Sequence, residues 1–216
     1  MDTINIDNGA YIVRDIIEII HKNAAMLSEI DGAVADGDHG INMDKGFQLV
    51  KERLGDEKKL ALAFDLLGET LMSEIGGSMG PLYGTFFLNI AKTIGEEENL
   101  SATLWSRALD AGLSGIQAVG GAVRGDKTIV DCLEPACLAL RLALHEDADF
   151  ASALDAMVDG AKEGKEETKQ MVAKMGRAAR LGERSKGTYD AGAVSCFLIL
   201  ESISTSMQRM LATPEN

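Results

Sequence analysis

A helical repeat of apolar residues, interrupted by polar segments that carry glycine, most constrains the fold of this 216-residue chain. Ile12, Ile16, Ile20 and Leu27, for example, fall on one face of a first helix. The chain has only three prolines, and aromatic residues make up 5% of it. Its hydrophobic fraction of 46% is enough for a sizeable core. We therefore expect an all-α protein with one core.

The periodicity predicts eight helices and no convincing strand. The expected helices span residues 12–30, 42–54, 59–75, 82–94, 101–119, 130–144, 150–175 and 193–211. Asp7 or Asn8 is expected to cap the first, and Pro135 to kink or delay the sixth. Short connections predict an eight-helix antiparallel up-and-down barrel or bundle, forming one domain over residues 1–216. Four connections then meet at one end, which is the geometry of a ligand site.

The connection after the first helix concentrates carboxylates. Asp31, Asp36 and Asp38 fall within eight residues. Carboxylates this close repel one another unless a cation lies among them, and Mg²⁺ prefers oxygen ligands. A solvated acidic turn is the alternative, because Asp and Gly are ordinary turn residues. An EF-hand is excluded, because its twelfth position requires glutamate and holds Phe47 or Asn42 here.

Three further connections have the composition of phosphate sites. Residues 76–80 are rich in glycine and can bring backbone N–H groups close to an anion. Residues 120–128 superficially match a P-loop, but Asp126 stands where its lysine should be and no strand precedes it. Residues 177–186 carry Arg177, Arg180, Arg184 and Lys186, and arginine suits bidentate phosphate contacts. Alone, each stretch also fits an ordinary turn or a solvated basic linker.

The charge of the chain limits its partners. It has 21 basic and 34 acidic residues, for a net charge of −13, and no basic patch. Nucleic acid and anionic membranes are therefore not expected as partners. A protein this acidic needs metal ions to bind a polyanion. Three cysteines in apolar surroundings indicate reduced core thiols, and no signal peptide or membrane-spanning run is apparent, so we expect a cytoplasmic location.

Four motifs, in this order, resemble the nucleotide-binding L subunit of dihydroxyacetone kinase. They are Asp-Gly-Asp-His-Gly-x-Asn-Met at 36–43, Gly-Gly-Ser-x-Gly-Pro-Leu-Tyr-Gly-Thr-Phe-Phe at 76–87, Gly-Asp-Lys-Thr at 125–128 and Gly-Arg-Ala-x-x-Leu-Gly-Glu-Arg-Ser at 176–185. The resemblance runs from the first expected helix to the last. His39 argues against the related fatty-acid kinases, which typically carry threonine there.

The resemblance implies a helical barrel with ADP or ATP at one end and two Mg²⁺ ions on Asp31, Asp36 and Asp38. Arg177 and His39 are the implied catalytic residues. The implied nucleotide contacts are His39, Gly40, Ile41, Asn42, Gly77, Ser78, Met79, Gly120, Thr128, Ile129, Arg177, Asp190, Ala191 and Gly192. Met79 replaces a small polar residue common in relatives, and Ala191 replaces a common proline.

The resemblance also implies partners. A K subunit binds dihydroxyacetone, a phosphohistidine-carrying M subunit rephosphorylates ADP in place, and the L subunit forms a homodimer. A transcription regulator is a further partner of some relatives. Two alternatives stay open: the acceptor is another short hydroxyketone or a tetrulose, or the chain is a nucleotide-sensing interaction module rather than an enzyme.

Overall fold

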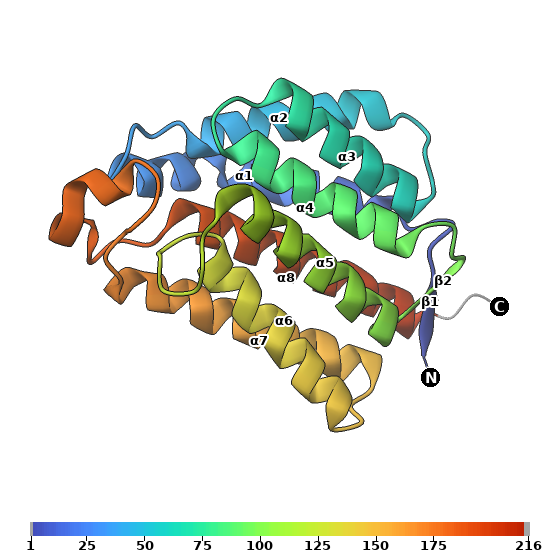
Figure 1. Cartoon of the computed structure of the whole chain (residues 1–216). Coiled ribbons are helices and arrows are strands. Elements are labelled where there is room, and N and C mark those ends of the chain that lie inside the picture. Colours follow the sequence, from blue (N-terminus) through green and yellow to red (C-terminus); the bar gives the residue numbers. More distant parts are fainter. Residues whose placement is uncertain (1, 214–216) are drawn as a thin grey trace.

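The computed structural model describes residues 2–213, so both ends of the predicted 1–216 domain extend beyond the described residues (Figure 1). Within this range, helices dominate. Their bounds are α1 Tyr11–Gly32, α2 His39–Leu54, α3 Leu60–Glu74, α4 Met79–Ile94, α5 Ala102–Gly120, α6 Val130–His145, α7 Phe150–Glu167 and α8 Ala191–Ala212. The all-α class and the eight predicted helices are confirmed.

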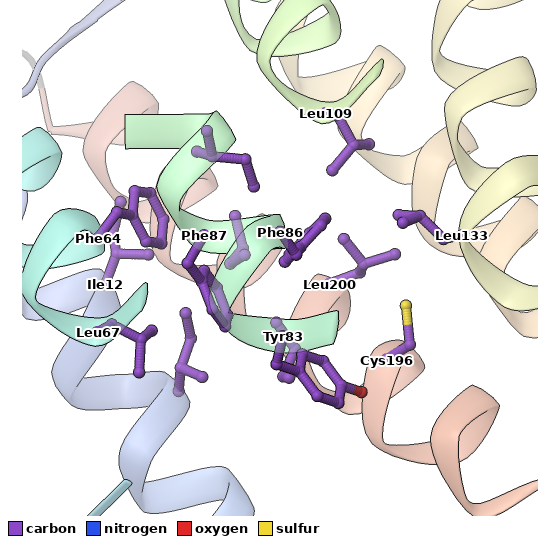
Figure 2. Close-up of a cluster of buried hydrophobic side chains, with 14 of the residues drawn as sticks. Ile12, Phe64, Leu67, Tyr83, Phe86, Phe87, Leu109, Leu133, Cys196 and Leu200 are labelled. Atoms are coloured by element: carbon purple, nitrogen blue, oxygen red, sulfur yellow. The ribbon is translucent and has the colours of Figure 1, made fainter. Parts of the chain in front are cut away.

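The helices close into a ring. Each packs against the next along the chain, and α8 packs against α1. Aromatic side chains of α3 and α4 fill the interior beside apolar residues of α5, α6 and α8 (Figure 2). The Phe87 ring lies 5.0 Å from Phe86 and 5.7 Å from Phe64, between ring centroids. This confirms the predicted antiparallel barrel. No helix in the described part is both long and apolar enough to cross a membrane.

A two-stranded sheet was not predicted. β1 (Thr3–Asn5) pairs antiparallel with β2 (Asn99–Ser101), with Ile4 opposite Leu100. Three residues per strand are too few to show alternation in the sequence. Both Ile4 and Leu100 are buried, so the sheet ties the start of the chain to the α4–α5 connection.

The helix boundaries correct three further predictions. α7 ends at Glu167, not near residue 175: Oγ1 of the buried Thr168 accepts from the N–H of the distant Asp190, and the chain leaves the helix at Met171. Neither Asp7 nor Asn8 caps α1, whose N-cap residue is Ala10. The Ala10 N–H is instead bonded to the Lys58 carbonyl. Pro135 lies inside α6 without delaying its start.

Two short 3₁₀ segments follow α7. They span Thr168–Gln170 and Ala178–Ser185, and the second is kinked at Gly182, which has a φ of 53°. Figure 1 shows this orange region at the left end of the barrel, together with the α1–α2, α3–α4 and α5–α6 connections. β1, β2 and the termini lie at the opposite end. The four polar connections thus meet at one end, as predicted.

Candidate functional site

Three carboxylates meet where α1 gives way to α2. Asp31 lies in the last turn of α1, Asp36 in the loop, and Asp38 at the N-cap position of α2. One oxygen of each lies within 4.8 Å of the others. The Gly37 N–H donates to Asp31 Oδ2 over 2.9 Å, and glycine permits the positive φ of 76° that this turn needs. The sequence spacing therefore does bring the predicted metal ligands together.

The donor set of this acid cluster (Asp31, Asp36, Asp38) fits a hard divalent cation. All three side chains offer anionic oxygens, which is the ligand chemistry of Mg²⁺. None of the three is fully buried, so a ligand can reach them. Arg177 Nη1 forms ion pairs with both Asp36 and Asp38, at 3.6 Å from the latter. The cluster therefore faces the arginine-bearing segment across the end of the barrel.

His39 is held by a hydrogen-bonded chain that reaches the core. Its Nε2 lies 2.9 Å from Ser195 Oγ on α8, which lies 2.7 Å from the hydroxyl of the buried Tyr83 on α4. Ser195 Oγ also donates to the Gly192 carbonyl. Burial lowers the pKa of His39 to about 4, against the opposing effect of the Asp31 carboxylate, so the ring is neutral at pH 7.

Other predicted contacts lie around the same opening. In the first loop, Gly40 is buried where a Cβ would overlap the Ala24 carbonyl, so this glycine also serves α1–α2 packing. Ile41 is 65% exposed and its N–H donates to Ser28 Oγ, while Asn42 follows one residue later and its N–H bonds to the Asp38 carbonyl.

The glycine loop before α4 is open. No atom approaches within 4 Å of a Cβ built at Gly77, whose φ is 71°. Ser78 occupies the N-cap position of α4 without a side-chain cap bond, and Met79 begins the helix against the core. The start of a helix presents free N–H groups, which favour an anion. The loop is therefore open enough to admit an anion at the start of α4.

The remaining predicted contact residues lie in the α5–α6 connection and at the start of α8, at the same end of the barrel. Gly120 ends α5 against Leu82, and Thr128 Oγ1 accepts from the Val130 N–H at the start of α6. A Cβ on Gly192 would lie 3.5 Å from the Ile129 nitrogen, so the first turns of α6 and α8 adjoin. Ala191 is buried beside them.

Asp190 is the N-cap residue of α8 and accepts from the Ala193 N–H over 2.8 Å. Burial raises its pKa to about 7, although this hydrogen bond and the Lys127 ammonium oppose the rise. The charges of Asp131 and Asp31 act in the same direction as burial. The carboxyl group therefore titrates near neutral pH.

Four residues with roles at this end were absent from the predicted site: Tyr83, Lys127, Asp131 and Ser195. Tyr83 and Lys127 do lie inside the quoted motifs, which is the signal that could have singled them out. Asp131 is fully buried and accepts from the Gly125 and Thr128 N–H groups. A carboxylate inside an apolar stretch was its only signal. The sequence carried no signal for Ser195, because serine is common in helices.

With this geometry in place, comparison with known proteins gives the class. The DAK2 domain family matches residues 33–205, so the chain belongs to that family. The family expected from the loop motifs is confirmed. Relatives include the PEP-dependent dihydroxyacetone kinase 1, ADP-binding subunit DhaL, of Listeria innocua, at 36% identity over 88% of this chain and 91% of the relative. The corresponding Escherichia coli subunit is 33% identical over 87% of this chain and 90% of its own length.

Solved structures of a dihydroxyacetone kinase have a similar fold. The dihydroxyacetone kinase of C. freundii matches with a TM-score of 0.70 at 28% identity, over 91% of this chain and 34% of that one. The same enzyme in complex with AMP-PNP and Mg²⁺ matches with a TM-score of 0.69, over 91% and 33%. This chain thus spans about one third of that kinase. The named relatives are kinases, in agreement with the predicted enzyme class.

Proposed function

We propose that this chain is the nucleotide-binding subunit of a dihydroxyacetone kinase. It holds Mg-ADP or Mg-ATP at the loop end of the barrel and passes the γ-phosphoryl group to dihydroxyacetone on a partner K subunit. A phosphohistidine-carrying M subunit rephosphorylates the ADP in place. We place this system in the cytoplasm. The observation that carries the proposal is the acid cluster, which faces Arg177 at the end where the four family motifs meet.

The metal ligands, Arg177 and His39 have separate roles in this proposal. Asp31, Asp36 and Asp38 hold two Mg²⁺ ions, whose charge offsets the negative charge that spreads during phosphoryl transfer. Arg177 adds a positive guanidinium on the same side and assists that stabilisation. The neutral His39, fixed by Ser195, contacts the ligand as a hydrogen-bonding group rather than as a charge. No described residue stands as a clear general base here, consistent with activation of the acceptor on another subunit.

The other contacts shape the nucleotide site. The N–H groups of residues 77–79, at the start of α4, donate to phosphate oxygens, and residues 40–42 at the start of α2 line the nucleotide on the other side. Gly120, Thr128 and Ile129 line the side formed by the α5–α6 connection, and Asp190, Ala191 and Gly192 line the start of α8. We also propose a homodimer, and a transcription regulator as a further partner.

Asp36→Ala and Asp38→Ala test the ligand assignment. We expect either change to abolish Mg²⁺-dependent ADP retention, measured by native mass spectrometry, while circular dichroism shows unchanged helicity. The control Asp159→Ala removes an acid on the exposed part of α7 and leaves retention unchanged. Retained nucleotide in both cluster variants would refute the assignment. A wild-type chain that is isolated empty and exchanges ATP freely would favour direct use of ATP over a resident ADP.

Three relatives support a second acceptor. L-erythrulose kinase of Pectobacterium atrosepticum is 29% identical over 87% of this chain, and L-erythrulose 1-kinase and D-erythrulose kinase of Mycolicibacterium smegmatis are each 30% identical. This chain covers about a third of each relative, at 32%, 36% and 31%. A four-carbon ketose is therefore the alternative acceptor. Assays with each candidate K subunit, comparing dihydroxyacetone with erythrulose, distinguish the two.

A further inference from the structure

Lys127 is a buried lysine with no part in the proposed contacts. Its side chain belongs to a residue only 3% exposed, in a backbone conformation with a φ of 61°. The ammonium donates to the carbonyls of Ser185 over 2.6 Å, Thr188 over 2.7 Å and Met171 over 3.3 Å. An ammonium has three donors, so these carbonyls satisfy all of them.

The three carbonyls flank Arg177 along the chain. Met171 precedes the arginine, while Ser185 and Thr188 follow it. The ammonium therefore closes the base of the loop formed by residues 171–188, which we call the arginine loop. Inside this base, Ser185 Oγ accepts from the Ala173 N–H and donates to the Gly182 carbonyl.

Apart from Lys127, main-chain hydrogen bonds tie the arginine loop to the rest of the chain: the Lys174 N–H donates to the Asp126 carbonyl and the Gly187 N–H to the Lys169 carbonyl. Among residues 171–188, only Ala173 and Ser185 are buried, so burial of apolar surface contributes little to its order. Arg177 itself is exposed, and its ion pairs to Asp36 and Asp38 are surface contacts of small intrinsic strength. The hydrogen bonds from Lys127 are charge-assisted and shielded from solvent, fully to Ser185 and partly to Met171 and Thr188, which makes them stronger than neutral ones.

The lysine is fixed from the barrel side. The buried Asp131 carboxylate of α6 accepts from the N–H groups of Gly125 and Thr128, on either side of Lys127. Asp126 adds a main-chain link, because its carbonyl accepts from the Lys174 N–H. A continuous path of polar contacts thus runs from α6, through residues 125–128, to the arginine loop.

We propose that Lys127 is a positioning residue that holds the arginine loop, and with it Arg177, over the acid cluster. It acts through the main chain of the loop and touches no reacting group. The effect on phosphoryl transfer rests on the proposed function, whereas the effect on the order of the loop does not.

Lys127→Met tests the proposal, because methionine approximates the length of the side chain without its donors. Arg180 and Arg184 are two of the tryptic sites in the arginine loop, and neither is changed in the variants compared. We expect cleavage after these two, mapped by mass spectrometry on the folded full-length chain, to accelerate about tenfold or more. The matched control is Lys174→Met, which removes an exposed ammonium of the same loop, 3.2 Å from Asp126 Oδ1. Its cleavage rate is expected to stay within about twofold of wild type.

A reconstituted kinase assay adds the readout that general destabilisation would not give. Lys127→Met lowers kcat about as much as Arg177→Ala, while the dissociation constant for Mg-ADP changes little. The double variant is no slower than Arg177→Ala alone, because both changes remove the same contribution. Additive losses would overturn the positioning role.

The digestion experiment can also overturn the proposal in two ways. Unchanged cleavage after Arg180 and Arg184 in folded Lys127→Met overturns the proposal. Cleavage that rises equally along the whole chain does the same, since it reports global unfolding. If Lys127→Met does not fold, Lys127→Gln, which keeps amide donors on a shorter stem, undergoes the same digestion. Faster cleavage of the loop with no phosphoryl transfer by wild type would uphold the positioning role and refute the proposed function.

Discussion

The carboxyl group of Asp190 caps the N-terminus of α8, and its burial disfavours the charged form. Its pKa of about 7 exceeds the ordinary value of 3.8. Between these values the folded chain keeps a proton that the unfolded chain has lost, so stability falls as pH rises through this window. An asparagine at this position retains the capping oxygen but cannot titrate.

Asp190→Asn should therefore change the pH dependence of stability. Relative to the variant, the wild type loses roughly 1 to 2 kcal/mol of unfolding free energy between pH 5 and pH 8, a value discounted for partial solvent access. Urea unfolding followed by circular dichroism, with EDTA present and nucleotide absent, measures the difference. A wild-type-to-variant difference that is the same at both pH values would contradict the assigned burial.

Ser195 links His39 to Tyr83 and is fully buried. Ser195→Ala leaves the Tyr83 hydroxyl with a 3.3 Å contact to the Gly192 carbonyl and frees the His39 ring. We expect a loss of about 1 to 3 kcal/mol in unfolding free energy and weaker binding of Mg-ADP. The control Thr205→Ala, on an exposed part of α8, should stay within about 0.5 kcal/mol of wild type. Equal stability of the two variants would argue against this chain of hydrogen bonds.

At the scale of elements, α6 and α7 pack closely. Two glycines of α7 face the part of α6 where Pro135 interrupts the helical hydrogen bonding. Pro135 has no N–H, so the Asp131 carbonyl lacks its usual helical partner. A Cβ on Gly164 would overlap that carbonyl and lie 2.9 Å from Pro135 Cγ. A Cβ on Gly160 would lie 2.7 Å from the Pro135 carbonyl.

Gly164→Ala should force α7 away from α6 and cost about 1 to 3 kcal/mol, measured by urea unfolding. Because Asp131 supports residues 125–128, we also expect faster tryptic cleavage of the arginine loop. Gly76→Ala is the matched control, since no atom lies within 4 Å of a Cβ there and its φ is not positive. Comparable losses in the two variants would show that close α6–α7 packing is not responsible.

The elements also show how far the sequence could predict this fold. Helical spacing placed all eight helices, because each has a continuous apolar face. It extended α7 to Met175 because Met171, Val172 and Met175 continue the apolar spacing. Thr168 and Asp190 end that helix through a contact between residues distant in sequence, which no local pattern reveals. The short pairing of β1 with β2 is likewise a tertiary contact.

The convergence of the three carboxylates of the acid cluster was also predictable from the sequence. Three aspartates within eight residues were compatible with either a cation site or a solvated acidic turn, and their oxygens do converge in the structure. The contacts of Ser195 and Lys127 were not predictable, because the partners of Ser195 lie up to 156 residues away and those of Lys127 up to 61. A contact between segments remote in sequence leaves no spacing by which to recognise it, even where a motif includes one of the two residues.

At the scale of the whole molecule, the β1–β2 sheet and the proposed nucleotide site lie at opposite ends of the barrel (Figure 1). α1 has 22 residues, which corresponds to a length of about 33 Å between the β1–β2 sheet and the acid cluster. Ile4, at 2% exposure, belongs to the core at the sheet end. A change at the sheet end should therefore affect folding without affecting nucleotide binding.

Ile4→Ala and Asp36→Ala test this separation by thermal unfolding with and without Mg-ADP. Ile4→Ala should cost about 2 to 5 kcal/mol but keep the full stabilisation by ligand, about 2.7 kcal/mol at one hundred times the dissociation constant. Asp36→Ala should leave the ligand-free Tm nearly unchanged and lose that stabilisation, as EDTA does for the wild type. Loss of the ligand effect in Ile4→Ala would show instead that the two ends are coupled through the helices. The barrel would then transmit packing changes to the acid cluster, and the same scan over Leu100 would locate the path.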